Sequence, residues 1–238
     1  MVVHADLKGL WNIPLYNNMF NNSNPQTNGE HLFYTMIKDK IDVIFDIGCR
    51  DDSEFTTFEG EVHYFDPVSS FIENLSKQPN KNKKAYFNTF GLGSENKTLF
   101  YYPRFQSFYD RIASCSISDD SNKVELTVKR GKDYVMENGI KGIDFLKIDT
   151  EGYELHVLQG FEDYLQNVKI VQFEYGGTFL DNNTKLIDVI QHLTKHGFHK
   201  FSYLTQSGIV PIVDMNDHYQ YCNIVCTHQT NNIAIMWI

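Results

Sequence analysis

Acids and glycines follow the short apolar runs of this sequence. Those that end a run are Asp46 and Gly48, Asp66, Gly91, Asp149 and Glu151, and Glu174. An ionised side chain at the end of a buried strand must be solvated or paired. A carboxylate can accept hydrogen bonds or take up a proton, whereas glycine lets a ligand approach the backbone closely. These residue types predict a site for a positively charged or hydroxyl-bearing ligand.

Such a site needs elements that bring the ends of five runs together. The runs alternate with helical patterns, such as the apolar stripe of Leu155, Leu158, Phe161 and Leu165 within a helix expected from Tyr153 to about Gln166. This alternation predicts an α/β fold, with a mostly parallel seven-stranded sheet and helices on both faces. Ligands of open parallel sheets bind outside the carboxyl ends of the strands. We therefore expect the acids and glycines at one rim.

The sequence predicts one domain over 29–238 preceded by an Asn-rich arm at 1–28. We expect the strands of the sheet at 41–48, 62–67, 84–93, 143–149, 169–177, 200–205 and 218–229. The segments 97–103 and 123–129 predict an extended insertion near 100–126. A helix is expected over 30–40, with its apolar face formed by Leu32, Phe33, Met36 and Ile37.

Composition excludes several classes of partner. The chain has 21 basic and 30 acidic residues, and a net charge of -9 argues against a nucleic-acid partner. No apolar run is long enough for a membrane span, and the first residues lack a secretory pattern. Four scattered cysteines predict reduced thiols, with Cys222 and Cys226 packed on one face of a strand. We expect a soluble, cytoplasmic protein.

The turn DIGCRDD at 46–52 limits the choice of cofactor. A glycine and free amides at this position favour anionic groups, and Asp66 at the next strand end can accept both hydroxyl protons of a ribose. A nicotinamide cofactor would use the same geometry, but its fingerprint needs three glycines in the pattern G-x-G-x-x-G. The turn has only Gly48, which disfavours a nicotinamide-dependent oxidoreductase.

The segments VIFDIG, VHYFDP and DFLKIDTEGYELHVLQG resemble the FkbM family of S-adenosylmethionine-dependent methyltransferases, which belongs to the class I, Rossmann-like group. The family's most distinctive stretch, K-I-D-x-E-G-x-E, corresponds to Lys147–Glu154. The resemblance extends from about Val43 to Cys226 and leaves out the arm and the insertion. It implies that residues 29–238 form a class I methyltransferase domain that uses S-adenosyl-L-methionine.

The resemblance also implies which residues bind the cofactor. Asp46 and Gly48 would lie near its methionine part, Asp66 would bind its ribose, and Asp149 would lie near its sulfonium and the acceptor hydroxyl. The full set of expected cofactor-binding residues is Asp46, Gly48, Cys49, Arg50, Asp66, Pro67, Phe90, Gly91, Leu92 and Asp149.

The first turn departs from the pattern common in the family. Cys49, Arg50 and Asp52 stand where the family commonly has Ala, Asn and a second Gly. The charge of Asp52 could repel the cofactor's carboxylate, and Arg50 could compensate by pairing with that carboxylate.

Methyl transfer from a sulfonium to an oxygen requires positioning of the two groups and removal of the hydroxyl proton. Asp149 and Glu151 can divide these tasks, and Glu174 is a further candidate base, so we expect these three as catalytic residues. Glu151 could instead satisfy free amides at a helix start. We expect no metal, because acids alone do not establish a coordination geometry, although their oxygens would suit Mg²⁺.

The resemblance favours a hydroxyl acceptor, most of all on a sugar or glycan, with another small-molecule hydroxyl as the alternative. Aromatic residues of the insertion can stack on such an acceptor or fill a small core: Tyr101, Tyr102, Phe105, Phe108 and Tyr109. A further alternative is a non-catalytic binding module of a glycan-building assembly. Partners from a glycosyltransferase pathway would suit either interpretation.

Overall fold

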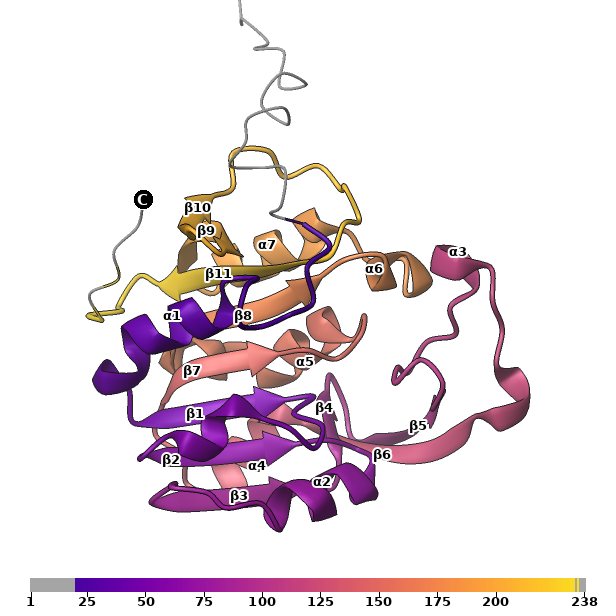
Figure 1. Cartoon of the computed structure of the whole chain (residues 1–238), viewed down its shortest axis with the longest axis horizontal. Helices are drawn as coiled ribbons and strands as arrows, with labels where there is room; N and C mark the ends of the chain where they lie inside the picture. Colours follow the sequence, from indigo (N-terminus) through magenta and orange to yellow (C-terminus); the bar gives the residue numbers. More distant parts are fainter. Residues whose placement is uncertain (1–19, 234, 236–238) are drawn as a thin grey trace, which may run out of the picture.

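The computed structural model describes residues 20–233 and 235, and these residues build a large sheet with helices on both faces (Figure 1). Within them the main sheet has eight strands in the order β10-β9-β11-β8-β7-β1-β2-β3. Their bounds are β1 (Val43–Ile47), β2 (Glu61–Phe65), β3 (Lys84–Asn88), β7 (Ile143–Ile148), β8 (Val168–Tyr175), β9 (Phe198–Thr205), β10 (Gly208–Pro211) and β11 (Cys222–His228).

The sheet is mostly parallel, as the sequence predicts. β3, β2, β1, β7 and β8 pair in parallel, and β11 pairs antiparallel with both β8 and β9 as the expected late hairpin. The expected count of seven strands is wrong, because β10 adds an eighth that pairs antiparallel with β9. Its short run ends at Pro211, a residue that strands tolerate at a sheet edge, and β10 lies at that edge.

The order of strands reverses between β1 and β7. From β1 the chain continues through β2 to β3 on one side, and it later returns to place β7 and β8 on the other side of β1. A reversal of this kind leaves a crevice at the carboxyl ends of the two central strands, where open α/β sheets bind ligands.

A second sheet stands beside the carboxyl ends of the main one (Figure 1). Its strands are β4 (Gly91–Gly93), β5 (Lys97–Tyr101) and β6 (Val124–Arg130), in the order β4-β6-β5. The run at 84–93 is therefore divided between two sheets. The expected insertion contains the end of β5, the start of β6 and, between them, α3 (Ile112–Cys115) and η4 (Asp120–Asn122).

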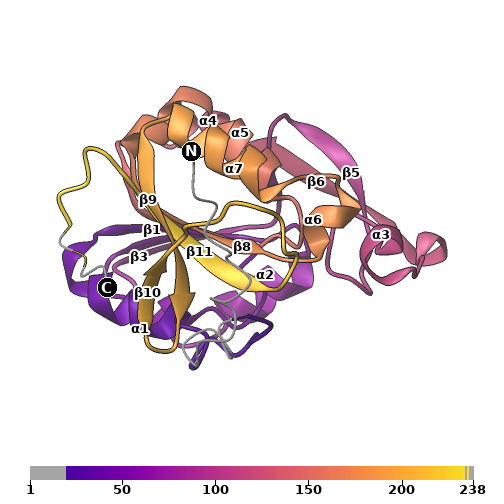
Figure 2. The same cartoon turned by 90° about the horizontal axis from the view of Figure 1, so that it is seen from above.

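Helices cover the main sheet on two sides (Figure 2). One side carries α1 (Glu30–Ile37), η2 (Lys38–Lys40), η3 (Glu54–Thr57) and α2 (Ser69–Ser76), whereas the other carries α4 (Gly131–Glu137), α5 (Glu154–Phe161), η5 (Glu162–Asn167) and α7 (Leu186–Lys195). α6 (Thr178–Asp181) follows β8 at the rim. Strand residues alternate between the two cores, since Ile44 packs on the α1 side and Phe45 on the α5 side.

Two helices differ from the expectation. The helix expected from Tyr153 to about Gln166 divides into α5 and η5, because Glu162 adopts a left-handed φ of 50° between them. In α1 the buried face is Glu30, Phe33, Tyr34 and Ile37, so the expected apolar face is wrong at Leu32, which is 40% exposed. Glu30 is buried because Asn28 and Gln172 both donate hydrogen bonds to its carboxylate.

Residues 1–19 of the expected arm lie outside the described residues. Residues 20–28 run as bends and turns beside the start of β11, where the backbone of Asn21 bonds to Tyr221. Cys222 and Cys226 are free thiols buried on the same side of β11, as expected. Among the described residues, no helix combines the length and the hydropathy that a membrane crossing requires.

Candidate active site

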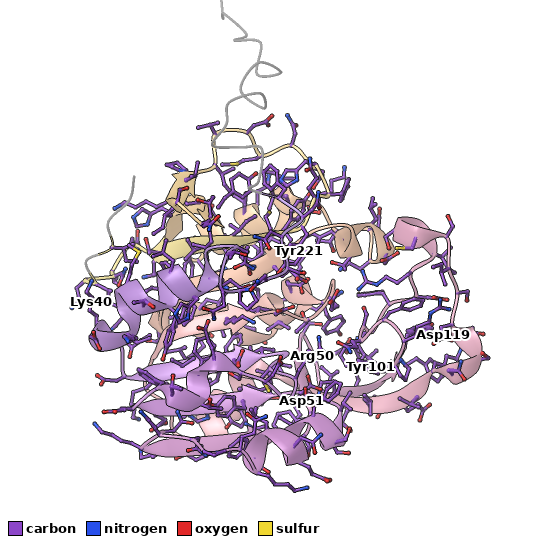
Figure 3. The ribbon with its side chains drawn as sticks, in the orientation of Figure 1. Lys40, Arg50, Asp51, Tyr101, Asp119 and Tyr221 are labelled. Atoms are coloured by element: carbon purple, nitrogen blue, oxygen red, sulfur yellow. The ribbon has the colours of Figure 1, made fainter. Side chains whose placement is uncertain are left out.

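A cavity of about 490 Å³ opens at the carboxyl rim, between the main sheet and the insertion. Its wall is built from the ends of β1, β2, β7 and β8, from β4 of the second sheet, and from the insertion and α6. Arg50 and Tyr101 both line this cavity, and Figure 3 shows Tyr221 beside β11. The volume lies within the range of small-molecule and cofactor sites.

The turn after β1 brings the backbone close to the central strand β7. Gly48 has a φ of 82°, and a Cβ atom at this position would lie 1.8 Å from the carbonyl oxygen of Asp149. Its amide donates to the carbonyl of Phe65 at 2.8 Å, which ties the turn to β2. Only glycine fits this position, and Gly48 lines the cavity as expected.

The carboxylate of Asp66 organises the next part of the wall. Its Oδ1 accepts the amide of Val68 at 2.8 Å, and its Oδ2 accepts the amide of Arg50 at 3.2 Å. Burial raises the pKa of Asp66 to about 6. The carboxylate is thus held between two backbone amides at the cavity, and each of its oxygens keeps a lone pair for a ligand.

Arg50 and Pro67 also line the cavity, and Arg50 adopts a left-handed φ of 54°. The Arg50 guanidinium lies 5.9 Å from the ring centroid of Phe71, in α2. Asp52, whose charge raised the question of repulsion, is exposed and does not line the cavity. Arg50 is therefore the charged residue of this turn that faces the cavity.

Three of the expected cofactor-binding side chains lie behind the cavity wall. Asp46 is 2% exposed, and its Oδ2 accepts a hydrogen bond from the hydroxyl of Ser53 at 2.5 Å. Cys49 packs into the core on the α1 side, and burial raises the pKa of its thiol well above the ordinary value. Phe90 packs on Phe65. The neighbours of Phe90 in β4, Gly91 and Leu92, do line the cavity.

The segment K-I-D-T-E-G-Y-E divides its acids between two tasks. Glu154 points inward and is 1% exposed, and its Oε1 accepts the amide of Thr150 at 2.8 Å and the amide of Gly152 at 3.2 Å. The task of satisfying free amides, considered for Glu151 from the sequence, therefore belongs to Glu154. Asp149 and Glu151 face the cavity instead.

Asp149 forms an ion pair with a partly buried lysine of β7. The Nζ of Lys147 lies 3.2 Å from Asp149 Oδ2 and 4.0 Å from Glu30 Oε2. Burial alone lowers the pKa of Lys147, but the carboxylates of Asp149 and Asp46 outweigh that effect and raise it well above the ordinary value. Lys147 is therefore a permanent cation that orients Asp149.

Glu151 is held by a residue of the insertion. Its Oε2 accepts a hydrogen bond from Arg111 Nη2 at 2.6 Å, and Arg111 Nη1 lies 3.8 Å from Asp181 Oδ2 in α6. Burial and then the neighbouring Asp149 raise the pKa of Glu151, whereas Arg111 opposes that shift. Glu151 has a left-handed φ of 54°, and its carbonyl accepts the hydroxyl of Ser107 at 2.7 Å.

Glu174, at the end of β8, differs from the other two acids because it has no hydrogen-bond or ion-pair partner among the described residues. It is 7% exposed and lines the cavity, and none of residues 20–233 and 235 donates a hydrogen bond to its carboxylate. Burial, and then Asp149 and Glu151, raise its pKa well above the ordinary value. One oxygen of each of these three acids lies within 4.8 Å of the others.

The insertion contributes more to the cavity than the sequence predicts. Of its aromatic residues, Tyr101 and Phe108 line the cavity, whereas the ring of Tyr109 packs against Tyr153. Sequence reasoning missed Arg111 and also Tyr221, which lines the cavity from the start of β11. The sequence offered one signal for Arg111, which is a charged residue in an insertion rich in aromatic residues.

The strand order, the crevice at the β1 and β7 ends and the carboxylates on its rim define an α/β enzyme of the class I methyltransferase type. The sequence profile described as the methyltransferase FkbM domain matches residues 46–200. The chain therefore belongs to the FkbM methyltransferase family, and it is an S-adenosylmethionine-dependent methyltransferase. None of the curated proteins compared matches it in sequence.

Several solved structures are similar to this chain at low identity. The plantazolicin methyltransferase BpumL in complex with SAH is 11% identical, with 86% of this chain and 82% of BpumL covered and a TM-score of 0.45. An SAM-dependent O-methyltransferase from Thermotoga maritima is 10% identical, with coverage of 89% and 66% and a TM-score of 0.41. A fibrillarin pre-rRNA processing protein from Methanococcus jannaschii is 9% identical, with coverage of 92% and 85% and a TM-score of 0.43.

Proposed function

We propose that this methyltransferase transfers its methyl group to a hydroxyl oxygen, most of all on a sugar or glycan. The observation that carries the proposal is the carboxylate of Glu174, which accepts no hydrogen bond from the part of the chain that the structure describes and faces the same cavity as Asp149 and Glu151. Removal of a hydroxyl proton needs an acceptor close to the reacting oxygen, and carboxylates can fill that role.

In this proposal the cofactor occupies the part of the cavity nearest to β1 and β2. Asp66 accepts the ribose hydroxyls, and the close turn at Gly48 leaves room for the methionine part beside Arg50. Gly91 and Leu92 border the adenine. Asp46, Cys49 and Phe90 then act indirectly, by supporting the wall from behind.

The acceptor occupies the part nearest to β8, α6 and the insertion. Its hydroxyl oxygen attacks the methyl carbon, a carbon–oxygen bond forms, and the carbon–sulfur bond breaks to leave a neutral thioether. The hydroxyl proton passes to a carboxylate of Asp149, Glu151 or Glu174. Positioning supplies most of the acceleration, since the reacting oxygen and the methyl carbon must lie in line.

A sugar acceptor is supported by the mixture of groups on this side of the cavity. Tyr101, Phe108 and Tyr221 offer aromatic faces, and Arg111 and Thr178 offer hydrogen-bond donors. Sugars combine apolar faces with many hydroxyls, and such a lining can recognise both. A hydroxyl on another small molecule is the alternative acceptor, and partners from a glycosyltransferase pathway remain part of the proposal.

Transfer of a labelled methyl group from S-adenosylmethionine to a panel of sugars and glycans tests the proposal. Asp149→Asn is expected to reduce turnover by about a hundredfold while cofactor affinity changes little, because it removes a proton acceptor. Asp66→Ala is expected to weaken cofactor binding instead. Equal, large losses of binding in both variants would contradict this division of roles.

The competing function is a non-catalytic binding module of a glycan-building assembly. It predicts cofactor-independent binding of a glycan or a protein partner and no methyl transfer to any hydroxyl of the panel. A cytoplasmic location is also proposed, supported by the free thiols of all four cysteines. Cell fractionation tests the location.

A further inference from the structure

Three carboxylates converge on one point of the cavity, and their oxygens are not fully used by the protein. Asp149 Oδ2 is paired with Lys147 and Glu151 Oε2 with Arg111, so within the described residues one oxygen of each accepts no hydrogen bond. Glu174 keeps both of its oxygens. Each of the three acids therefore keeps at least one oxygen that no group of the described residues uses.

Glu174 supplies an observation that the cluster by itself does not. The residue is 7% exposed, it lines the cavity, and no residue in the described part of the chain donates a hydrogen bond to its carboxylate. Buried polar groups are hydrogen-bonded or paired in most proteins, and a buried carboxylate without a partner is costly. A ligand that supplies positive charge at this point would satisfy it.

The separation of the three oxygens suits a metal ion. The three oxygens lie no more than 4.8 Å from one another, so some point lies within about 2.8 Å of all three. That bound is the distance from the centre to a corner of an equilateral triangle with sides of 4.8 Å. Hard divalent cations bind oxygen at about 2.0–2.6 Å, so shifts of less than about 1 Å would complete the coordination.

We propose that Asp149, Glu151 and Glu174 together bind a hard divalent cation of the magnesium or calcium class. The site lies where the acceptor is placed in the proposed function, so the catalytic role of the cation rests on that function. A hydroxyl bound to the cation is positioned beside the methyl group and loses its proton more readily. The proton passes to a carboxylate oxygen that does not contact the cation.

Titration of the purified protein with Mn²⁺ tests the site directly, because the electron paramagnetic resonance signal of free Mn²⁺ reports the bound fraction without any catalytic assay. One bound ion per chain is expected, displaced by Mg²⁺ or Ca²⁺, and Glu174→Gln should weaken its affinity about tenfold or more. The matched control is Asp144→Asn, which neutralises a buried acid near the start of β7, outside the cavity, and should leave the affinity within about twofold.

Calorimetric titration with S-adenosylhomocysteine establishes that each variant is folded, since this ligand does not need Glu174 in the proposed arrangement. Absence of Mn²⁺ binding by the folded wild-type protein overturns the proposal, as does binding that Glu174→Gln leaves unchanged. If hydroxyl methylation proceeds unaltered in a chelator, the catalytic role of the cation is wrong while the proposed function stands. If the cation binds but no hydroxyl is methylated, the metal site stands and the proposed function is wrong.

Discussion

Asp66→Asn provides the sharpest test of how the cavity binds its cofactor. Each carboxylate oxygen of Asp66 accepts one backbone amide and keeps a lone pair for a ribose hydroxyl. Asparagine keeps a single acceptor oxygen, so one of the two ribose bonds is lost and the other loses its charge assistance. The lost hydrogen bond costs about 2 kcal/mol and the lost charge assistance about 1 kcal/mol. Together, about 3 kcal/mol should raise the dissociation constant of the cofactor about 150-fold.

The pH dependence of binding identifies the carboxylate as the cause. Burial raises the pKa of Asp66 to about 6, so the acceptor carboxylate is present above pH 6 and is lost as the pH falls below it. At pH 5 about one tenth of the molecules keep the carboxylate, and the wild-type dissociation constant should be about tenfold higher than at pH 8. Asp66→Asn has no carboxylate at this position and should lack this change.

Calorimetric titration with S-adenosylhomocysteine at pH 5, 6, 7 and 8 measures both effects. Asp52→Asn is the matched control, because it makes the same substitution at an exposed position of the first turn. Thermal melts of the two variants at each pH verify the fold. A dissociation constant within threefold of wild type for Asp66→Asn, or an unchanged pH dependence in that variant, would refute the assignment of the ribose to Asp66.

Three further predictions concern the turns around the cavity and the insertion. Gly48→Ala should lower the free energy of unfolding, measured in urea, by about 3 kcal/mol or more. Gly139 has open space around it, so Gly139→Ala should lower that free energy by only about 1 kcal/mol. Equal losses in the two variants would contradict the close contact between Gly48 and the carbonyl oxygen of Asp149. Burial raises the pKa of Glu154 from 4.5 to about 7. The free energy of unfolding of the wild-type protein, measured in urea, should therefore fall by about 3 kcal/mol as the pH rises from 4.5 to about 7. Glu154→Gln should not show this decrease. Arg111→Met should raise the KM for the acceptor about tenfold and leave the cofactor dissociation constant unchanged, whereas the exposed Arg104→Met should alter neither.

Two left-handed residues of the site, Arg50 and Glu151, share a physical explanation. Arg50 and Glu151 each adopt a φ of 54°, which costs a non-glycine residue about 1 kcal/mol or more. The amide of Arg50 is held by Asp66, and the carbonyl of Glu151 is held by Ser107. The surrounding contacts therefore fix both turns in the form that exposes their side chains to the cavity.

Local pattern by itself was enough to indicate the α/β fold and the rim of the site. Apolar runs and helical stripes follow from burial, and parallel strands joined by crossovers place all their carboxyl ends on one edge. Gly48, Asp66 and Asp149 line the cavity for this reason, whereas Gly91 reaches it from β4 of the second sheet. The short edge strand β10 escaped prediction because its four residues end in proline, which is unusual in strands.

Only the tertiary structure decided which acids face the ligand and which hold the protein together. Glu151 and Glu154 stand three residues apart in one acidic stretch, yet one faces the cavity and the other caps a turn. The partners of these two acids lie at different separations in sequence. Glu154 accepts hydrogen bonds from the adjacent turn, whereas Glu151 pairs with Arg111, 40 residues away. Local pattern sets the direction of a strand, but the partner of a charged side chain depends on which distant segment folds against it.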